Sequence, residues 1–305
     1  MTYKLNKNLI VIAGPTAVGK TMITIKLAKY FDTSVINADS RQVYREMSIG
    51  TAKPSIGEMA GVKHYFVGSK SLNNLFNAGI FEKEALAICD EVFSKKDLLI
   101  LSGGSGLYIN ALCEGLDEFP EVESVIRKDL NEEFEASGLE PLLEELRIHD
   151  PEYYRIVDLQ NPKRVIRALE VIRASGKPYS FFRKRVRRER SFGLVKIGLH
   201  RNKPDLYDRI NQRMDRMIEG GLFAEVKSLI AFRNHNTLQT VGYQEIFNHL
   251  DGKYDYDEAV RLMKQNSRRY AKRQITWFRR DPEYRWFHPE LFEEIVAYIT
   301  SKVQE

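Results

Sequence analysis

Short apolar runs alternate with helix-like repeats in the first third of the chain. LIVIA (residues 9–13), SVIN (34–37) and DLLILSGG (97–104) are apolar runs of strand length, set off by glycine or polar residues. Residues 21–31 and 78–94 instead repeat their apolar positions at helical spacing. Strands that alternate with helices in this way are typical of a parallel sheet with helices on both faces.

The pattern changes after Gly115. Residues 116–190 contain no convincing strand but several helical segments. In NPKRVIRALEVIRASGKP, Asn161 is placed to cap a helix, Pro162 occupies its first turn and Gly176 ends it. This part of the chain is therefore predicted to be a helical insertion.

Beyond the insertion, LVKIGL (194–199) has the composition of a core strand that returns to the sheet. The remainder is predicted to be helical, ending in a long basic helix from about residue 257 to 280. We find no internal repeat and no low-complexity tract.

A phosphate-binding motif lies between the first strand and the first helix. GPTAVGKT (14–21) matches GxxxxGK[ST], in the strand–loop–helix context that the motif requires. Its backbone N–H groups can cradle a pyrophosphate, Lys20 adds a positive charge, and the Thr21 hydroxyl can bind Mg²⁺. The motif is shared by nucleotide-binding and ATP-binding proteins, and does not reveal whose phosphates it holds.

Together these features predict an α/β fold: a parallel sheet of the P-loop NTPase type, flanked by helices, with an inserted all-helical domain. Residues 1–115 and 191–305 are expected to form the core, and residues 116–190 the insertion. No run approaches the roughly eighteen apolar residues of a membrane span, and the N-terminus leads straight into a strand. We therefore expect a cytoplasmic protein with no membrane association.

Charge is segregated along the chain, although the net charge is only +5. Residues 114–145 contain twelve acids and two bases, whereas RKRVRRER (183–190) has six bases and one acid. Residues 264–280 carry seven bases and no acid. This distribution predicts one face suited to a polyanion.

Cys89 and Cys113 lack zinc or disulfide spacing and are expected to be buried apolar residues.

Asp39 follows the second strand, in NADSRQVY (37–44). A carboxylate there could ligate a metal, accept a proton from a substrate, or cap a helix. NTPases usually end a further apolar strand in an aspartate that supports Mg²⁺. The corresponding run here, LLILSGGSG, ends in serine and glycines, which disfavours a motor ATPase.

Six motifs in order resemble the tRNA dimethylallyltransferase family, also called tRNA isopentenyltransferases or IPP transferases. They are GPTAVGKT, NADSRQVYREMSIGTAKPS, GGSGLYINAL, NPKRVIRALEVIRASGKP, TVGYQE and AKRQITWFRRD. The resemblance spans about residues 9–287. It implies transfer of a dimethylallyl group from dimethylallyl diphosphate to N6 of the adenine immediately 3′ of the anticodon, with release of diphosphate.

On this resemblance the P-loop holds an isoprenoid diphosphate with Mg²⁺, and the catalytic residues are Asp39 as general base, Lys20 and Thr21, the last also the Mg²⁺ ligand. A helix cap and a water-mediated Mg²⁺ contact remain alternatives for Asp39. Diphosphate contacts are implied for Gly14, Pro15, Thr16, Ala17, Val18, Gly19, Lys20, Thr21 and Arg213. Thr16 could instead only form the turn, and Arg213 alone would be interpreted as a solvated helix charge.

The resemblance also implies contacts with the tRNA anticodon arm, whose target base must be extruded into a pocket. The residues concerned are Asp39, Ser40, Arg41, Gln42, Ser105, Arg127, Arg164, Arg167, Gly242, Tyr243, Lys272 and Arg273. Ser105 stands where the family often has threonine. The three arginines of the insertion could alternatively be ordinary surface charges.

The last helix places Arg269, Arg273, Thr276 and Arg280 on one stripe and Tyr270, Gln274 and Trp277 on the next. Basic residues beside aromatic ones suit a phosphate backbone. Tyr270 and Trp277 are nevertheless expected to be core residues and not stacking platforms. The run at 183–190 is either a mobile arm that grips the RNA stem or a solvated tract.

Three other functions remain open. An adenylate isopentenyltransferase would share the phosphate loop and the aspartate but use free nucleotides, which have little need of the insertion or of AKRQITWFRRD. A P-loop kinase would consume ATP, and an RNA-binding protein could carry an inactive site. We expect a monomer, and nothing in the sequence implies a protein partner.

Overall fold

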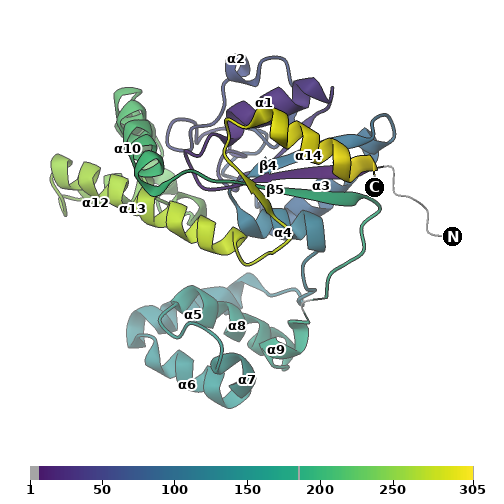
Figure 1. The fold of residues 1–305 in the computed structure, drawn as a ribbon. Coiled ribbons are helices and arrows are strands. Elements are labelled where there is room, and N and C mark those ends of the chain that lie inside the picture. Colours follow the sequence, from purple (N-terminus) through teal and green to yellow (C-terminus); the bar gives the residue numbers. More distant parts are fainter. Residues whose placement is uncertain (1–6, 185, 305) are drawn as a thin grey trace. The chain divides into compact units, whose positions relative to one another are not determined.

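The computed structural model describes residues 7–184 and 186–304 (Figure 1). The chain forms two compact units, with the divisions at Glu114 and Arg188, next to the predicted boundaries at 115 and 190. The larger unit is built from the segments before and after the insertion, and the smaller unit is the insertion itself. We describe each unit by itself.

A six-stranded parallel sheet forms the centre of the larger unit, as the alternating pattern predicted. Its order is β3-β2-β4-β1-β5-β6. The strands are β1 (Asn8–Ala13), β2 (Val35–Ala38), β3 (His64–Tyr65), β4 (Leu98–Gly103), β5 (Gly193–Leu199) and β6 (Arg285–Phe287). All pairings are parallel, and β1 lies between β4 and β5.

The helices of the larger unit cover this sheet and extend beyond it (Figure 1). They are α1 (Lys20–Tyr30), α2 (Ile56–Met59), α3 (Ala78–Phe93), α4 (Gly106–Glu114), α10 (Lys203–Glu219), α11 (Leu222–Ser228), α12 (Tyr243–Leu250), α13 (Tyr256–Phe278) and α14 (Phe292–Gln304). Short 3-10 helices span Ile230–Phe232 and Asn236–Leu238.

The sheet is buried on both faces, which explains why its central strands are continuous apolar runs instead of alternating ones. Every residue of β1 is buried, and Ile10 and Ile12 pack with Leu27 of α1 and Ile299 of α14. Both cysteines are buried, as predicted, and burial raises the pKa of the Cys89 thiol to about 12. The Cys89 thiol is therefore not set up as a nucleophile.

Strand register brings the chemistry to one edge of the sheet. Ala13 at the end of β1 pairs with Gly103 of β4, which in turn pairs with Ala38 of β2. The P-loop, Asp39 and the GGSG turn follow directly on these residues. Because carboxyl ends of parallel strands meet at one edge, these three segments converge there, where open α/β sheets bind their ligands.

Sequence patterns missed the edge strands. Residues after 199 were expected to be helical, but β6 adds a strand beside β5, with Ile197 opposite Arg285 and Leu199 opposite Phe287. β3 has only two residues beside β2. Strands of two or three residues are too short for periodicity to show, and their edge position depends on the sheet already formed by distant segments.

The smaller unit is all helical, as predicted. It consists of α5 (Ser124–Ser137), α6 (Glu140–His149), α7 (Pro151–Tyr154), α8 (Pro162–Ser175) and α9 (Tyr179–Phe182). The α8 helix begins and ends as its sequence indicates: Asn161 Oδ1 accepts the Arg164 N–H, and Gly176 stops the helix with φ of 66°. Leu130, Leu146 and Leu169 lie in one apolar core.

No helix in the described part of the chain is both long and apolar enough to span a membrane.

Candidate active site

The P-loop wraps around the N-terminus of α1. Gly19 caps this helix with φ of 113°, in the left-handed region that favours glycine. A side chain at Gly14 would place its Cβ 2.9 Å from the Leu199 carbonyl oxygen, so the turn out of β1 also needs glycine. The sequence motif thus specifies a backbone path that directs N–H groups of the loop toward one concavity.

Three side chains outside the motif hold the loop. Arg209 Nε donates to the Ala17 carbonyl (2.9 Å), and Arg201 Nε donates to the Val18 carbonyl (3.0 Å). On another side, the Thr16 N–H donates to Gln274 Oε1 (2.9 Å). No sequence motif predicted these three contacts. For Arg209, the sequence offered one indication of a role at the site: it lies one helical turn before Arg213, a predicted diphosphate ligand.

Lys20 is half-buried and folds back onto its own loop. Its Nζ donates to the carbonyl oxygens of Gly14 (2.9 Å) and Pro15 (2.8 Å). Burial and the nearby charge of Arg213 lower the pKa of Lys20 to about 7, while the carboxylate of Asp39 opposes this shift. A partly buried lysine whose charge is disfavoured gains most when an anion binds beside it.

Arg213 comes from α10 and belongs to the same site. It is half-buried, and its Nη2 donates to the Thr51 carbonyl (3.1 Å). Burial lowers the pKa of Arg213, again opposed by Asp39. The interpretation of Arg213 as a solvated helix charge is therefore wrong. The site combines two enclosed cations with one carboxylate, an arrangement that favours an anionic ligand.

Asp39 is held at the end of β2. Its Oδ1 accepts the backbone N–H groups of Arg41 (2.9 Å) and Gln42 (3.2 Å), which fixes a tight Asx turn. The next residue, Ser40, donates its N–H to Ser105 Oγ (3.0 Å), and the two hydroxyls lie 3.2 Å apart. The structure thus brings Asp39, Ser40 and Ser105 together.

The loop after Asp39 is held from within. Gln42 Nε2 donates to the Thr51 carbonyl (3.0 Å), and Gln42 Oε1 accepts from Asn37 Nδ2 (3.1 Å). Arg41 Nη2 lies 3.4 Å from the Asn236 carbonyl oxygen. The Thr51 carbonyl therefore accepts from both Gln42 and Arg213, so the position of this loop sets the positions of two predicted site residues.

Glu225 of α11 supports that loop. Its carboxylate accepts the three backbone N–H groups of residues 48–50 at 2.7–3.0 Å, and the Tyr243 hydroxyl at 2.6 Å. Tyr243 is fully buried, and Gly242 is buried beside it. The tRNA contact predicted for Tyr243 is therefore wrong, because its side chain is buried and supports the loop through Glu225. The contact predicted for Gly242 stays a prediction, since a Cβ there would meet open space.

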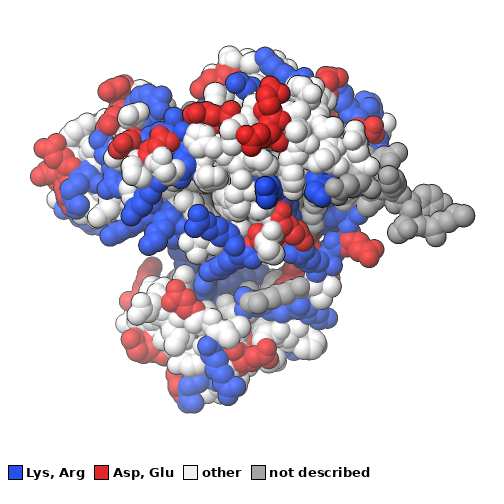
Figure 2. Space-filling view, viewed as in Figure 1, with Lys and Arg blue, Asp and Glu red and all other residues white. Residues whose placement is uncertain are grey.

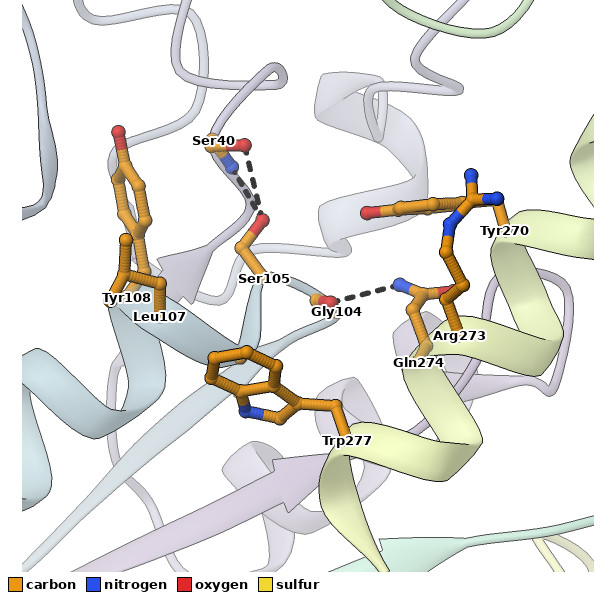
Figure 3. Close-up of a pocket in the computed structure, with 10 residues that line it drawn as sticks. Ser40, Gly104, Ser105, Leu107, Tyr108, Tyr270, Arg273, Gln274 and Trp277 are labelled. Atoms are coloured by element: carbon orange, nitrogen blue, oxygen red, sulfur yellow. Dashed lines mark hydrogen bonds between the residues drawn. The ribbon is translucent and has the colours of Figure 1, made fainter. Parts of the chain in front are cut away.

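A pocket opens beside Ser40, the residue that follows Asp39 in the chain (Figure 3). It encloses about 310 Å³, within the range of small-molecule sites. Its lining residues are Ser40, Gly104, Ser105, Gly106, Leu107, Tyr108, Tyr270, Arg273, Gln274 and Trp277. In Figure 3 the rings of Tyr270 and Trp277 project from α13 into the space in front of the β4–α4 turn.

Tyr270 and Trp277 are not core residues. They are 38% and 37% exposed, respectively, and both line the pocket, so the expectation that they would be core is wrong. The helical stripe that carries them faces the turn at Gly104–Gly106 and not the sheet. Trp277 lies so close that a Cβ at Gly106 would be 2.1 Å from its Nε1. The aromatic faces are thus available to a planar ligand.

The basic face predicted from α13 is present. Lys272 and Arg273 are exposed, as are Arg269, Arg279 and Arg280. In Figure 2 basic side chains gather over the region in which Figure 1 draws α13. A dense group of cations on one helix suits a phosphate backbone.

The arginines of the insertion divide into two kinds. Arg127 and Arg167 both bind Glu170, with Arg127 Nη2 and Arg167 Nη1 at 2.9 and 3.0 Å from its Oε2. Glu170 is buried, whereas Arg164 is exposed. The ion pairs orient Arg127 and Arg167, and Arg164 remains on the surface one helical turn before Arg167.

Several arginines of the basic run at 183–190 form ion pairs with acidic residues of the protein. Arg187 and Arg188 pair with Glu114 and Glu118. Arg190 is nearly buried, binding Glu82 and the Leu112 carbonyl. The prediction of a single RNA-gripping arm is therefore wrong for Arg190. Arg185 lies outside the described residues.

Comparisons with known proteins agree on one family. The family model described as IPP transferase matches residues 42–281. The chain is 52% identical over 301 residues to the tRNA dimethylallyltransferase of Cytophaga hutchinsonii, which covers 99% of each chain. It is 47% identical over 298 residues to tRNA dimethylallyltransferase 1 of Bacteroides fragilis, covering 98% of this chain and 99% of the relative.

Solved structures give the same picture. The tRNA isopentenylpyrophosphate transferase of Bacillus halodurans is 37% identical with a TM-score of 0.73, over 98% of this chain and 97% of that one. A eukaryotic dimethylallyltransferase, described as acting on tRNA, is 26% identical with a TM-score of 0.72, over 89% of this chain and 69% of that one. The similarity therefore extends from the sequence to the fold.

Proposed function

This chain belongs to the IPP transferase family of tRNA dimethylallyltransferases, and on that premise we propose how its own residues carry out the transfer. The donor is dimethylallyl diphosphate, and the acceptor is N6 of the adenine immediately 3′ of the anticodon. The observation that carries the proposal is the placement of two enclosed cations, Lys20 and Arg213, beside the single carboxylate of Asp39.

The P-loop binds the diphosphate of the donor. As the allylic C–O bond breaks, its electron pair passes to the diphosphate, and the negative charge on that group grows. Backbone N–H groups of the loop that remain unpaired in the protein, together with Lys20 and Arg213, stabilise this charge. The lowered pKa values of both cations support the assignment, because a diphosphate would restore their preference for the charged form.

The donor atoms present fit Mg²⁺. Thr21 offers an exposed hydroxyl in the first turn of α1, where P-loop proteins place a magnesium ligand. Mg²⁺ usually takes few protein ligands and completes its coordination with phosphate oxygens and water. Thr21 would hold the ion, with Asp39 as a possible partner through water, and the ion would neutralise part of the diphosphate charge.

Asp39 accepts the proton. The N6 lone pair forms the new bond to the allylic carbon, and one N6 proton passes to the free oxygen of the carboxylate. Because Oδ1 is fixed by the Arg41 and Gln42 N–H groups, Oδ2 is the oxygen left to face a substrate. General-base catalysis of this kind contributes about 10²–10⁴-fold.

The pocket beside Ser40 receives the extruded adenine. Its volume suits one flat base, and the rings of Tyr270 and Trp277 offer stacking surfaces. Ser40 and Ser105 supply hydroxyls on the opposite wall, and Arg273 lies at the pocket on the basic side of α13. The RNA backbone would follow the cations of α13, with Arg164 of the insertion as a further contact.

One assay tests the proposal. Dimethylallyl diphosphate labelled in the allyl group is incubated with the protein, Mg²⁺ and either unmodified tRNA or AMP, beside an ATP-hydrolysis control. We expect label in tRNA alone. Label in AMP would establish an adenylate isopentenyltransferase instead, and ATP consumption without prenyl transfer would establish a kinase.

RNA binding has its own test. If about five basic residues neutralise phosphates, the logarithm of RNA affinity falls with the logarithm of salt concentration at a slope of about −3 to −5. A slope near zero, measured by anisotropy with a labelled anticodon stem-loop, would rule out the basic face of α13 as the RNA surface.

A further inference from the structure

Gln274 is a buried amide between two loops of the active site. It lies on α13 and is only 6% exposed. Its Oε1 accepts the Thr16 N–H from the P-loop (2.9 Å), and its Nε2 donates to the Gly104 carbonyl after β4 (2.9 Å). Figure 3 shows the second of these bonds. One side chain therefore connects three segments that are remote in sequence.

The partners determine both the residue type and its orientation. Thr16 presents an N–H, which requires an acceptor, while Gly104 presents a carbonyl, which requires a donor. The glutamine amide offers both, an acceptor oxygen and a donor nitrogen on one side chain. Gly104 permits the close approach, because a Cβ there would lie 2.4 Å from Gln274 Nε2. Such a fully paired buried polar group specifies one arrangement of its neighbours.

The bridge joins the two proposed ligand sites. Tyr270 and Trp277, one turn before and one turn after Gln274 on α13, line the pocket. Thr16 belongs to the loop that would bind diphosphate. Since Gln274 is attached rigidly to the same helix as both rings, a ligand that fixes α13 also fixes the Thr16 end of the P-loop.

We propose that Gln274 is a positioning residue that couples occupancy of the acceptor pocket to the diphosphate loop. RNA in the pocket fixes the position of α13 through contacts with Tyr270 and Trp277, and the Gln274 bridge then holds the P-loop in its binding form. Each ligand consequently binds more tightly when the other is present, by the same factor in both directions. The inference rests on the proposed function, because it takes RNA and a diphosphate as the two ligands.

The experiment measures that factor in the full-length protein. Affinity for inorganic diphosphate with Mg²⁺ is determined by calorimetry, with and without a saturating unmodified anticodon stem-loop. For the wild type we expect the RNA to tighten diphosphate binding by about 5–150-fold, the usual range of such coupling.

Two variants remove the bridge in different ways. Gln274→Met has similar volume but neither hydrogen bond, and Gln274→Glu, in its ionised form, can accept from Thr16 but cannot donate to Gly104. We expect both to bring the factor close to one. Gln265→Met is the matched control: Gln265 lies on the same helix but not at the P-loop or the pocket, so this variant keeps the factor.

The outcomes separate the two proposals. A wild type that binds both ligands and transfers the prenyl group, but whose coupling factor is one or survives in both Gln274 variants, overturns the coupling inference alone. Equal loss of both affinities with the factor retained assigns Gln274 a structural role and overturns it as well. A wild type that binds neither ligand instead refutes the proposed function.

Discussion

The insertion and the P-loop edge differ in the partners of their buried and half-buried charged side chains. In the insertion, Glu170 accepts hydrogen bonds from Arg127 and Arg167, and Arg173 binds both Glu133 and Glu145. At the P-loop edge, Lys20 and Arg213 donate to backbone carbonyls. In the insertion, the charges are neutralised by side chains of opposite charge. At the P-loop edge, the positive charges of Lys20 and Arg213 are bonded only to neutral carbonyl groups.

The pKa values move accordingly. Burial pushes the pKa of Glu170 upward, but hydrogen bonds from its two arginines bring it below the ordinary value. Hydrogen bonds to Glu145 and Glu133 raise the pKa of Arg173. Burial lowers the pKa of Lys20 and Arg213 instead. Buried charges that are paired within the protein, such as Glu170, indicate a structural role. Partly buried cations with lowered pKa values and no paired carboxylate, such as Lys20 and Arg213, indicate a site for an anionic ligand.

The largest expected effect is at Asp39. Asp39→Asn keeps an oxygen that accepts from Arg41 and Gln42 but removes the base, so transfer should fall by about 10²–10⁴-fold. Affinities for diphosphate and for RNA should persist. Single-turnover transfer and calorimetry measure the two effects, with Asp208→Asn, an exposed aspartate on α10, as control. An equal loss of diphosphate affinity would show that Asp39 acts through Mg²⁺.

Next in size is the effect of Lys20 on the ligand. Lys20→Met removes a charge-assisted hydrogen bond to the diphosphate, worth about 1.5–3 kcal/mol, or roughly 10- to 150-fold in affinity. Calorimetry with inorganic diphosphate at pH 6 measures it. Unchanged affinity would mean that the loop binds through its N–H groups alone.

Without ligand, Lys20→Met should stabilise the folded protein. Lys20 has a folded pKa near 7 and an ordinary value near 10.4, so the unfolded chain holds its proton more firmly. Its charge therefore destabilises the unliganded fold fully below pH 7, and the cost fades as pH rises toward 10. We expect Lys20→Met to raise the melting temperature at pH 6, with a smaller gain at pH 9. A gain that grows with pH would contradict the assignment.

Removing the buried carboxylate of the insertion should lower the stability of the protein. Glu170→Gln leaves Arg127 and Arg167 without their carboxylate, and should cost about 1–2 kcal/mol, less than a fully buried pair because both arginines are partly exposed. The pKa of Glu170 is lowered in the fold, so this stability is present above about pH 4 and is lost as pH falls further. Urea unfolding measures it.

A matched control lies in the same unit. Glu144 pairs with Arg147 three residues on, and both side chains are more than half exposed. Glu144→Gln should leave stability unchanged within error. A cost equal to that of Glu170→Gln would remove the distinction between buried and surface pairs on which the comparison depends.

The smallest effect concerns the support of the active-site loop. Tyr243→Phe removes one hydrogen bond to Glu225, whose carboxylate keeps the N–H groups of residues 48–50. We expect a loss of about 1 kcal/mol in urea unfolding. RNA affinity should not change, because Tyr243 is buried. Tyr256→Phe, at an exposed position of α13, is the control, and selective loss of RNA affinity would restore the original tRNA assignment.

Local sequence determined the parts of this protein that depend on neighbouring residues. Strand β1, the P-loop glycines and the cap at Asn161 each follow from a few adjacent residues, because backbone sterics and capping act over one turn. The position of Asp39 at a strand end followed from the second apolar run. Six motifs in order sufficed to predict the family.

Only the tertiary structure decided what lies opposite what. Gln274 meets Thr16 across 258 positions, and Glu225 reaches residues 48–50 across about 175. Tyr270 and Trp277 carry the same helical periodicity as core residues, yet their stripe faces a pocket. Periodicity tells which side chains share a face, but the element that covers that face is set by how the whole sheet and its helices pack.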